Sequence, residues 1–391
     1  MMKTQVTIIG GGPSGLLLSQ VLMNAGIDTI IIEKHSKEHV LSRIRAGVLE
    51  QGTVDILETV GVGTRIKKEG FKHEGTVISS EKKSFRISFK EAVNKNVTIF
   101  GQTEVTKDLY EAQESTDAKI IHGVSDVIIM DPLESRQEVL FTDREGIRNK
   151  INSDFVVGCD GFHGVSRNTI PNDKKKEFER IYPFGWLGIL SETPPVSEEL
   201  IYANTKDGFA LCSMRNENLS RYYIQCSLKR KAEDYTDSYF WQQLRNRLPN
   251  NFQENLVTGP SIEKSIAPLR SFVVEPLQYG QLFLVGDAAH IVPPTGAKGL
   301  NLAFSDVYYL SFALKSFYAG QGSNELKNYS RRALSRIWKA VRFSWWMTTL
   351  MHEFPRADAF DRKIKLSEID YLSNSKKAQT VFSENYVGLP L

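Results

Sequence analysis

The sequence predicts a mixed α/β (α+β) fold, in which a Rossmann-like dinucleotide-binding domain carries an inserted antiparallel-sheet domain and is followed by a helical C-terminal region. An apolar strand, a glycine-rich turn, a helix and a second strand occupy residues 5–33. A further apolar strand and glycine-rich loop occur much later, at residues 282–302. Between them, aromatic residues become frequent in short strand-like segments over residues 182–266. Nucleotide-binding features on both sides of a strand-rich segment indicate an insertion.

The first segment has the glycine pattern of a dinucleotide-binding turn. Gly10, Gly12 and Gly15 follow the apolar run at residues 5–9 and precede a helix expected at residues 16–25. The first glycine permits a tight turn, the second lets the backbone approach a pyrophosphate, and the third lets the helix pack closely on the strand. The N–H groups and the dipole at the start of the helix favour phosphates.

An acid after the second strand completes the pattern. The strand expected at residues 29–32 ends on Glu33, whose carboxylate can accept hydrogen bonds from the two hydroxyls of a ribose. The glycine pattern alone is a weak signal, but between two strands and before an acid it predicts a dinucleotide site. The alternative is a glycine-rich turn in an ordinary α/β domain.

Composition and charge exclude several classes of protein. The 391 residues, 41% hydrophobic and 24% charged, suit a globular chain of two domains or one elaborated domain. The apolar runs are too short for a membrane span, and we expect no signal peptide. A net charge of +3 is too small to indicate nucleic acid. Cys159, Cys212 and Cys226 have neither disulfide nor metal spacing, which favours the cytoplasm.

The segment after the second strand is expected near the nucleotide. Residues 34–39 are charged and polar, so we place them at the adenosine edge. Arg43 and Arg45, with Gly47 nearby, can clamp a pyrophosphate with planar donors, although a solvated surface pair is the alternative. A helix is expected at residues 49–57.

The next segments predict two further groups of strands. Alternation over residues 71–100 indicates antiparallel strands of a different layer, followed by a helix at residues 104–114. A small β-meander is expected from residues 127–130, 138–142 and 155–157. The turn after its last strand can bring Asp160 to the cofactor region, although a plain turn is the commoner meaning of Asp-Gly.

The aromatic-rich segment predicts a substrate domain. Strand-like stretches at residues 186–190, 209–214 and 222–227 indicate a mostly antiparallel sheet, serving as a lid or as the wall of a substrate site. Residues 229–248 are polar and amphipathic, which predicts one or two surface helices.

The chain then returns to the nucleotide-binding part. A strand at residues 282–285 delivers Asp287 to a glycine-rich loop, and a helix follows at residues 302–314. The start of this helix can again face an electron-rich ligand. The remaining chain is helical, and its tryptophans, Trp338, Trp345 and Trp346, fit core packing and a dimer face equally well.

These features divide the chain into three parts. We expect a discontinuous dinucleotide-binding domain at residues 1–70, 97–180 and 268–345. A substrate-binding β-sheet domain would comprise residues 71–96 and 181–267. The helical C-terminal region, residues 346–391, is a candidate dimer interface.

Three motifs, in this order, resemble those of the single-component FAD-dependent aromatic monooxygenases: Gly10-x-Gly12-x-x-Gly15, Cys159-Asp160-Gly161 and Gly286-Asp287-Ala288-Ala289-His290. Longer segments are similar to the 4-hydroxybenzoate 3-monooxygenase family: residues 43–51, 182–188, 199–204, 291–301 and 384–390. The resemblance runs nearly from end to end. It implies that NAD(P)H reduces FAD, that the reduced flavin reacts with O₂, and that 4-hydroxybenzoate is hydroxylated at C3 to protocatechuate in aromatic compound catabolism. It implies a homodimer and no metal, nucleic acid or membrane partner.

The resemblance assigns residues to both ends of the substrate. Arg215 would pair with the carboxylate, helped by Ser213 and Tyr223, with Met214 beside them. Without the resemblance, an exposed arginine and a packed tyrosine on a strand would be the simpler interpretation.

At the phenol end, the resemblance assigns a proton relay. Tyr202, hydrogen-bonded onward to Tyr386, would stabilise the phenolate and pass its proton out. His73 would stand at the solvent end, because histidine titrates near neutral pH. The Pro294 carbonyl would accept the phenol proton.

The resemblance also implies a set of FAD contacts. Glu33 would bind the adenosine ribose, Ser14 and Arg45 the pyrophosphate region, and Asp287 the ribityl chain, while Arg221 would help to position the isoalloxazine ring. The other residues expected at the cofactor are Gly10, Gly12, Gly15, Arg43, Ile44, Ala46, Gly47, Val48, Gln102, Asp160, Leu300 and Asn301.

NAD(P)H must bind without a Rossmann domain of its own, since the chain has one dinucleotide fingerprint. His163 and Arg270 are candidates for its contacts. Lys34 and His39 stand where relatives that prefer NADPH often carry arginine and tyrosine. Lysine keeps the charge but loses the planar fork, so we expect use of both NADPH and NADH, with NADPH moderately favoured.

Two rival functions remain at this stage. One is a related FAD monooxygenase acting on another phenolic acid, such as 3-hydroxybenzoate. The other is a non-catalytic binding protein on the same fold, of the Rab escort type. The presence of Asp287 and of the whole loop at residues 293–301 argues against the second.

Overall fold

The computed structural model describes residues 2–42 and 47–391, and a six-stranded sheet organises its first core. In order across the sheet, the strands are β19 (Gln278–Tyr279), β20 (Leu282–Leu284), β13 (Phe155–Gly158), β2 (Val6–Ile9), β3 (Thr29–Glu33) and β9 (Lys119–His122). All neighbouring pairs are parallel except β19 with β20. Strands β2, β3 and β13 are buried along their whole length, as is usual for the strands of a parallel sheet that is covered on both faces.

The turn after β2 needs glycine at two of its positions. Helix α1 (Pro13–Met23) begins on a proline, which suits the first helical turn. Gly10 has a φ of +110°, and a Cβ there would lie 2.3 Å from the Cys159 carbonyl oxygen. A Cβ on Gly15 would lie 2.0 Å from the Gly10 carbonyl oxygen. The close packing of α1 on β2 therefore follows from the glycine spacing.

A four-stranded sheet lies beside the parallel one and corrects the expected meander. Its order is β1 (Met2–Lys3), β12 (Arg148–Ser153), β11 (Gln137–Thr142) and β10 (Ser125–Ile129). The prediction that residues 155–157 complete the meander was wrong, because β13 pairs with β2 and β20, and β12 takes its place. The Phe-Val-Val run of β13 suits burial on both faces, whereas the polar sequence of β12 carries a weak strand signal.

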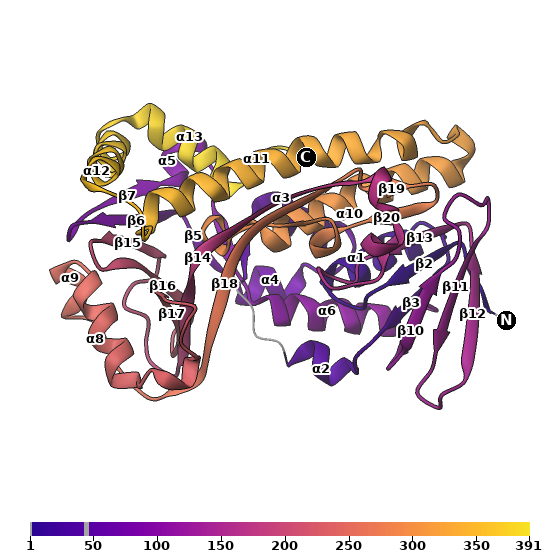
Figure 1. Ribbon diagram of the computed structural model, residues 1–391, viewed down its shortest axis with the longest axis horizontal. Coiled ribbons are helices and arrows are strands. Elements are labelled where there is room, and N and C mark those ends of the chain that lie inside the picture. The colour runs from indigo at the N-terminus through magenta and orange to yellow at the C-terminus, as the bar shows by residue number, and fades with distance from the viewer. Residues whose placement is uncertain (1, 43–46) are drawn as a thin grey trace.

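An eight-stranded sheet forms the second half of the molecule. Its order is β21 (His290–Ile291), β18 (Ser261–Glu275), β14 (Lys176–Ser191), β17 (Leu219–Cys226), β16 (Gly208–Asn216), β15 (Ile201–Thr205), β6 (Gly75–Ser80) and β7 (Lys83–Ser88). Only β15 and β6 pair in parallel. Figure 1 shows β14 and β18 as long ribbons that run from this sheet toward the parallel sheet. These two strands cross the domain boundaries expected at residues 181 and 268 without a break.

The two faces of this sheet carry different cores. One core contains Trp186, Tyr202, Phe209 and Leu211 and extends to the C-terminal helices. The other contains Leu187, Ile201, Ala210, Cys212, Tyr222 and Ile224 and is covered by helix α8 (Asp237–Arg247). The alternation follows from the period of two along a strand. Residues of one strand whose numbers differ by two or four therefore lie on the same face of the sheet. This alternation decides which side chains can belong to the candidate site.

Four α-helices after the glycine-rich loop complete the fold. Helix α10 (Gly299–Ser316) covers the parallel sheet, α11 (Asn324–Met351) runs along the top of the molecule in Figure 1, and α12 (Ala359–Asn374) and α13 (Lys376–Val387) lie near β6 and β7. The remaining helices are α2 (Lys37–Leu41), α3 (Gln51–Thr59), α4 (Thr64–Glu69), α5 (Phe89–Val93), α6 (Gln102–Glu114), α7 (Ser166–Thr169) and α9 (Asn250–Gln253). Strands β4 (Val48–Leu49), β8 (Val97–Ile99) and β5 (Phe71–His73) form a small fourth sheet. Within residues 2–42 and 47–391, no helix has the length and apolarity needed to cross a membrane.

Candidate functional site

The carboxyl ends of three parallel strands bring the three recognised motifs together. Strand β2 leads into the glycine-rich turn, β13 leads to Asp160, and β20 leads to Asp287. The Val285 N–H donates to the Gly158 carbonyl at 3.0 Å, which ties the last two strand ends to each other. Ligands of open parallel sheets bind at this edge. Segments about 130 to 150 residues apart along the sequence thus converge on one site through the order of the strands.

The glycine-rich turn is closed by Glu33. Its Oε2 accepts from the Gly11 N–H at 2.6 Å and its Oε1 from the His35 N–H at 2.8 Å. A Cβ built on Gly12 would meet no atom within 4 Å among the residues that the structure describes. The turn therefore leaves an open approach to the backbone at Gly12, next to the N-terminus of α1, which is the arrangement that receives a pyrophosphate.

The second motif packs against the first. Gly286 has a φ of +64°, and a Cβ there would lie 3.2 Å from Ser14 Oγ, so the two turns are adjacent. The fully buried Asp306 carboxylate accepts from the Gly286 N–H at 2.9 Å and lies 2.6 Å from His290 Nε2. Asp306 thereby fixes the turn at Gly286, which lies next to Ser14 and is followed by Asp287.

Asp160 is held by the protein itself. Its Oδ2 accepts from the N–H and the hydroxyl of Ser166, both at 2.9 Å. Burial raises the pKa of Asp160, and the Ser166 hydrogen bonds oppose that rise. The carboxylate shapes the loop that follows β13, so any contact of this segment with a cofactor depends on that loop.

The start of α10 joins the loop that carries Gly47 and Val48. The Asn301 amide donates to the carbonyls of Val48 and Ala297, at 2.8 and 2.9 Å. Its Oδ1 accepts from the Glu50 N–H at 2.9 Å and from the Thr53 hydroxyl at 2.7 Å. The side chain of Asn301 is thus saturated by protein groups.

The other expected cofactor residues lie around this junction. A Cβ on Gly47 would lie 1.9 Å from the Phe100 carbonyl oxygen, so glycine is required for the close packing of the two segments. Gln102 begins α6, and Leu300 is half-buried in the first turn of α10. Arg43, Ile44, Arg45 and Ala46 lie outside the described residues.

The expected substrate residues share one face of the eight-stranded sheet. Ser213 pairs with Arg221 and Leu211 with Tyr223 across β16 and β17, while Tyr202 pairs with Leu211 across β15 and β16. Since paired residues point to the same side of a sheet, Tyr202, Ser213, Arg221 and Tyr223 project together. Met214 is also buried but follows Ser213 directly, so the alternation turns it to the other side.

Arg215 is a half-buried cation whose Nε and Nη1 atoms are buried, and it has no carboxylate partner among the described residues. No described acid lies within ion-pair distance of its guanidinium, and its buried Nε and Nη1 have no hydrogen-bond partner within residues 2–42 and 47–391. Burial lowers the pKa of Arg215, while Tyr223 nearby raises it. A buried guanidinium with unpaired N–H groups costs free energy unless an anion binds it. The Ser213 hydroxyl donates to the Met214 carbonyl at 3.3 Å, close to this arginine.

Arg221, on the same face, is already neutralised. Its Nη1 lies 2.9 Å from Glu263 Oε2, its Nη2 donates to the Ser265 hydroxyl at 3.2 Å, and its guanidinium lies 5.1 Å from the Tyr223 ring. Burial opposes the charged form, but Tyr223 and Glu263 together raise the pKa of Arg221. Of the two arginines, Arg215 is therefore the one available to a carboxylate.

Tyr202 and Tyr386 are hydrogen-bonded as expected. Their hydroxyl oxygens are 2.8 Å apart, and both residues are 1% exposed. Burial raises the pKa of both phenols, and the hydrogen bond from Tyr386 opposes this for Tyr202. Pro294 is exposed at the start of a 3₁₀ turn, and its carbonyl accepts from the Ala297 N–H at 2.9 Å.

His73 is a buried histidine whose ring finds no described partner. It is 2% exposed at the end of β5, and neither ring nitrogen has a hydrogen-bond partner within residues 2–42 and 47–391. Burial lowers the pKa of His73 to about 4, although Glu199 opposes that effect. The ring is therefore neutral at physiological pH.

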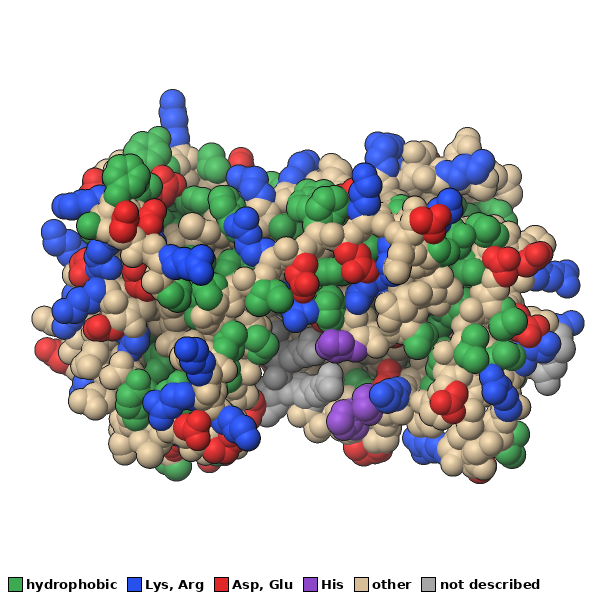
Figure 2. Space-filling model, viewed as in Figure 1, with side chains coloured by type: hydrophobic (Ala, Val, Ile, Leu, Met, Phe, Trp, Pro, Cys, Tyr) green, Lys and Arg blue, Asp and Glu red, His purple; other side chains and the backbone are tan. Residues whose placement is uncertain are grey.

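The candidate NAD(P)H residues fall into two groups. The His163 ring packs edge-on against Phe162 at 5.0 Å, and the Arg270 guanidinium lies 4.5 Å from the same ring. Lys34 precedes a stacked pair of rings, His35 and His39, whose centroids are 4.1 Å apart. In Figure 2 the histidine side chains visible on this face gather near its centre, beside basic side chains.

Two buried charges were missed by the sequence reasoning. The Lys298 ammonium donates to Glu50 Oε1 at 2.6 Å and to the Tyr386 carbonyl at 2.7 Å. Arg336 donates to the other oxygen of Glu50 at 3.0 Å. Burial lowers the pKa of Lys298, and Glu50 opposes this. Glu50 and Lys298 lie in two segments that were recognised as motifs, but only the fold shows that they meet next to Tyr386.

The chain matches a known protein family over most of its length. The family described as FAD binding domain matches residues 3–344. The chain is 53% identical over 390 residues to p-hydroxybenzoate hydroxylase of Acinetobacter baylyi, covering 100% of this chain and 96% of that protein. It is 25% identical to an uncharacterized aromatic compound monooxygenase of Bacillus subtilis, covering 83% of this chain and 64% of that protein.

Solved structures share the fold. The p-nitrophenol 4-monooxygenase from Pseudomonas putida DLL-E4 superimposes with a TM-score of 0.81 over 100% of both chains, at 18% identity. Aklavinone-11 hydroxylase, solved in a ternary complex with FAD and aklavinone, has a TM-score of 0.74 and 16% identity, covering 90% of this chain and 70% of that chain.

Proposed function

The chain belongs to the p-hydroxybenzoate hydroxylase family of FAD-binding aromatic monooxygenases, and from this premise we propose that it hydroxylates 4-hydroxybenzoate at C3 to protocatechuate, with FAD, NAD(P)H and O₂. The reaction belongs to the breakdown of aromatic compounds. Among the described residues, no three His, Cys, Asp or Glu side chains are grouped as metal ligands would be. The reaction is assigned to the flavin and to the side chains around the substrate because the FAD-binding family matches residues 3–344.

The unpaired Nε and Nη1 atoms of Arg215 are the observation that carries the proposal. Arg215 lies on the sheet face that also carries Tyr202, and Tyr202 pairs with Leu211, four residues before Arg215 on β16. Four residues of strand span about 13 Å. Side chains reaching inward from these two points suit a ring that bears a carboxylate at one end and a phenol at the other.

The residues around the glycine-rich turn fit FAD. The open approach at Gly12 and the N-terminus of α1 would hold the pyrophosphate, with Ser14 beside it. Glu33 would bind the adenosine ribose, and Asp287, next to Ser14, would bind the ribityl chain. Because the Asn301 side chain is occupied, we assign its cofactor contact to the backbone N–H groups at the start of α10, which have no acceptor within the helix. Bound FAD supplies the activation of O₂, which no amino-acid side chain supplies.

The side chains around the substrate would bind its carboxylate, stabilise charge at its phenol oxygen and transfer its proton. Arg215, with Ser213 and Tyr223, holds and orients the carboxylate, and a two-point contact fixes the ring position. Tyr202 stabilises negative charge at the phenol oxygen, and Tyr386 orients the Tyr202 hydroxyl through their 2.8 Å hydrogen bond. The Pro294 carbonyl retains one lone pair with which to accept a hydrogen bond from the phenol hydroxyl. His73 would stand at the solvent end of this relay, where its two unpaired ring nitrogens could pass a proton on, and its pKa of about 4 keeps the ring from retaining that proton at neutral pH.

NAD(P)H would bind outside the FAD site. We assign Arg270 and His163 to it because both pack on Phe162 and present polar atoms near the long strands β14 and β18. Lys34 and His39 would face the adenosine part. Arg270 also pairs with Glu179 at 3.1 Å, so binding would exchange that contact for a phosphate.

We further propose a homodimer. A groove of about 420 Å³ lies between α11 and the long strands, lined by Phe178, Trp338 and Trp345 among others. Trp338 and Trp345 are 38% and 39% exposed, whereas Trp346 packs on Phe343 and Phe382. Large exposed aromatics in a groove favour a protein contact. Sedimentation of the protein and of Trp345→Glu tests this, with a monomeric native protein as the contrary result. We place the enzyme in the cytoplasm because its three cysteines are free.

One experiment tests the proposed activity. The purified protein should show flavin absorption that changes when 4-hydroxybenzoate is added, and NAD(P)H oxidation should yield protocatechuate in equal amount. The same assay with 3-hydroxybenzoate tests the rival substrate. Faster, fully coupled turnover of that isomer, or the absence of flavin after reconstitution, would refute the proposal.

A further inference from the structure

His352 occupies a buried position that the proposed mechanism does not use. It follows the last residue of α11, is 0% exposed, and faces the same side of the eight-stranded sheet as Tyr202 and Tyr223. Its ring stacks on Phe184, with centroids 4.7 Å apart and an interplanar angle of 5°, and lies 4.4 Å from the Phe209 ring. The ring is therefore fixed on both sides.

The hydrogen bonds of His352 define its tautomer. The Trp186 indole Nε1 lies 2.6 Å from His352 Nε2, and an indole N–H is only a donor, so Nε2 accepts. Nδ1 must then carry the hydrogen that is donated to the Thr348 carbonyl at 2.9 Å. Burial, the largest cause, lowers the pKa of His352 to about 3, which agrees with a neutral ring.

Through Trp186, this histidine reaches the carboxylate end of the candidate site. The Trp186 ring lies 5.1 Å from the Tyr223 ring, and Tyr223 is the neighbour of Arg215. Gly188 provides the space for this arrangement, because a Cβ there would lie 2.6 Å from the Tyr223 ring. The chain of contacts from His352 to Trp186, Tyr223 and Arg215 is continuous.

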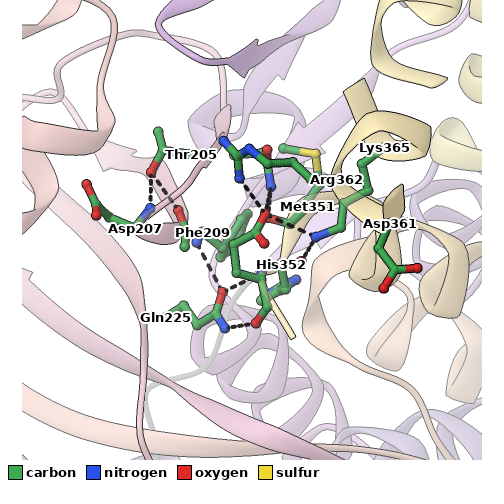
Figure 3. Close-up of polar contacts among 12 residues, drawn as sticks. Thr205, Asp207, Phe209, Gln225, Met351, His352, Asp361, Arg362 and Lys365 are labelled. Carbon is green, nitrogen blue, oxygen red and sulfur yellow. Dashed lines mark hydrogen bonds and ion pairs between the residues drawn. The ribbon is translucent and has the colours of Figure 1, made fainter. Parts of the chain in front are cut away.

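The backbone around His352 is tied to the strands of the site. The Gln225 amide donates to the Glu353 carbonyl and accepts from the Glu353 N–H at 3.0 Å, and Lys365 donates to the His352 carbonyl at 2.6 Å (Figure 3). Asn204 donates to the Met351 carbonyl at 3.1 Å. Asn204 and Gln225 each lie two residues after a site tyrosine on the same strand, so they share its face. The junction between α11 and α12 is thus fastened beside Tyr202 and Tyr223.

We infer that His352 is a positioning residue for the substrate carboxylate: as a neutral acceptor it holds the Trp186 indole against Tyr223, and this sets the alignment of Tyr223 with Arg215. The inference rests on the proposed function. It distinguishes the acceptor nitrogen from the bulk of the ring, because a phenyl ring would fill the same space and leave the Trp186 N–H unpaired.

Substitutions that separate these two properties provide the test. His352→Phe should raise the dissociation constant for 4-hydroxybenzoate, read from the flavin spectrum of the holoenzyme, three- to tenfold, with kcat at saturating substrate changed less than twofold. His352→Gln, whose carbonyl can accept from the indole, should restore binding to within twofold of the native protein. Equal binding by His352→Phe and the native protein, or no recovery in His352→Gln, would overturn the inference.

Variants of Trp186, the hydrogen-bond partner of His352, keep the test valid if His352→Phe fails to fold. Trp186→Phe removes the indole N–H and should weaken binding as His352→Phe does, and the double variant should be no worse than either, because one interaction is lost in all three. Additive losses, or unchanged binding in Trp186→Phe, would refute the pairing. The matched control is Trp241→Phe, which loses an indole hydrogen bond of 2.8 Å to Gly259 on the opposite face of the same sheet and should leave binding unchanged.

A spectroscopic measurement separates this inference from the proposed function. In protein labelled with ¹⁵N-tryptophan, the indole N–H signal that disappears in Trp186→Phe should shift in His352→Phe and remain in place in His352→Gln. A Trp186 indole signal that has the same position in His352→Phe as in the native protein would overturn the inference. If the indole signal shifts in His352→Phe but the flavin spectrum does not change when 4-hydroxybenzoate is added, the proposed function is refuted. The positioning role would then be refuted too, whereas the hydrogen bond between Trp186 and His352 would be supported.

Discussion

The hydroxyl oxygens of Tyr202 and Tyr386 lie 2.8 Å apart, although the two residues are separated by 184 positions in the chain. Tyr202 comes from β15 and Tyr386 from the end of α13, where the Lys298 ammonium donates to the Tyr386 carbonyl. The Tyr386 ring also stacks on Phe89 and Phe382, at 4.8 and 5.6 Å. The packed rings and the Lys298 contact therefore determine the orientation of the Tyr386 hydroxyl, and that hydroxyl in turn orients Tyr202.

Replacement of Tyr202 by phenylalanine should uncouple the reaction. Oxygen transfer to the ring needs negative charge to develop at the phenol oxygen, and a hydrogen bond to a charged group contributes about 1.5–3 kcal/mol, or roughly one to two decades in rate. Tyr202→Phe should still oxidise NAD(P)H in the presence of 4-hydroxybenzoate but release mostly hydrogen peroxide. The ratio of protocatechuate formed to NAD(P)H consumed measures this. A variant that remains fully coupled would exclude Tyr202 from the chemistry.

Arg215→Lys should weaken substrate binding without disturbing the flavin. Lysine keeps the positive charge but cannot offer two parallel N–H donors to a carboxylate. The loss of one charge-assisted hydrogen bond costs about 1.5 kcal/mol or more, which is roughly a tenfold higher dissociation constant. Titration of 4-hydroxybenzoate against the flavin spectrum gives the value, and Arg221→Lys, where Glu263 already neutralises the charge, is the comparison. Similar affinities for the native protein and Arg215→Lys would be evidence against the carboxylate contact.

Two substitutions in the glycine-rich turn should have different consequences. A Cβ on Gly12 meets nothing within 4 Å among the described residues, so Gly12→Val should fold but lose FAD, because the side chain would occupy the approach to the pyrophosphate. A Cβ on Gly15 would lie 2.0 Å from the Gly10 carbonyl oxygen, so Gly15→Val should fail to fold. Circular dichroism and the ratio of flavin to protein distinguish the two outcomes. Full flavin content in Gly12→Val would argue against the expected position of the pyrophosphate.

The choice of nicotinamide cofactor should depend on Lys34. Within residues 34–39 the Lys37 ammonium already pairs with Glu114, so the exposed Lys34 is our candidate cation for a 2′-phosphate. We expect both NADPH and NADH to be used, with NADPH moderately favoured, and we expect Lys34→Gln to reduce kcat/KM for NADPH more than for NADH. A native preference of about a thousandfold, roughly 4 kcal/mol, would indicate a dedicated site elsewhere.

The stability of the holoenzyme should fall in mild acid because of buried histidines. His73 has a pKa of about 4 in the folded protein against an ordinary value of 6.5. Between these values the unfolded chain binds a proton that the native protein does not, so the free energy of unfolding decreases as the pH falls, by about 1.4 kcal/mol per pH unit for one such group. His352 acts in the same direction.

His73→Gln tests this through urea unfolding between pH 7.5 and 4.5. The dependence of stability on pH below 6.5 should be smaller in the variant by about one proton, while above pH 7 the two proteins should show the same slope. Identical slopes over the whole range would mean that His73 is not kept neutral by its burial.

The nucleotide-binding half was predictable because its signals are local. The glycine spacing dictates the turn between β2 and α1, and the predicted helix and strands at residues 5–33 lie within three residues of the observed ones. The meander was predicted wrongly because residues 155–157 have the composition of a strand but nothing in them specifies a partner. Pairing is decided by which strands bury both faces, and that is a property of the assembled sheet.

The sequence by itself determined the family and the cofactor-binding turn, and it named the residues that we propose contact the substrate, since each depends on residue types at fixed spacings. Only the tertiary structure decided which of these groups are free to act. Glu263 neutralises Arg221 and no described acid neutralises Arg215, although both arginines lie within seven residues on neighbouring strands. His352 gave no signal in the sequence, because its role depends on an indole 166 residues away. Charge pairing and hydrogen bonding act over about 3 Å in space, and distance along the chain does not specify them.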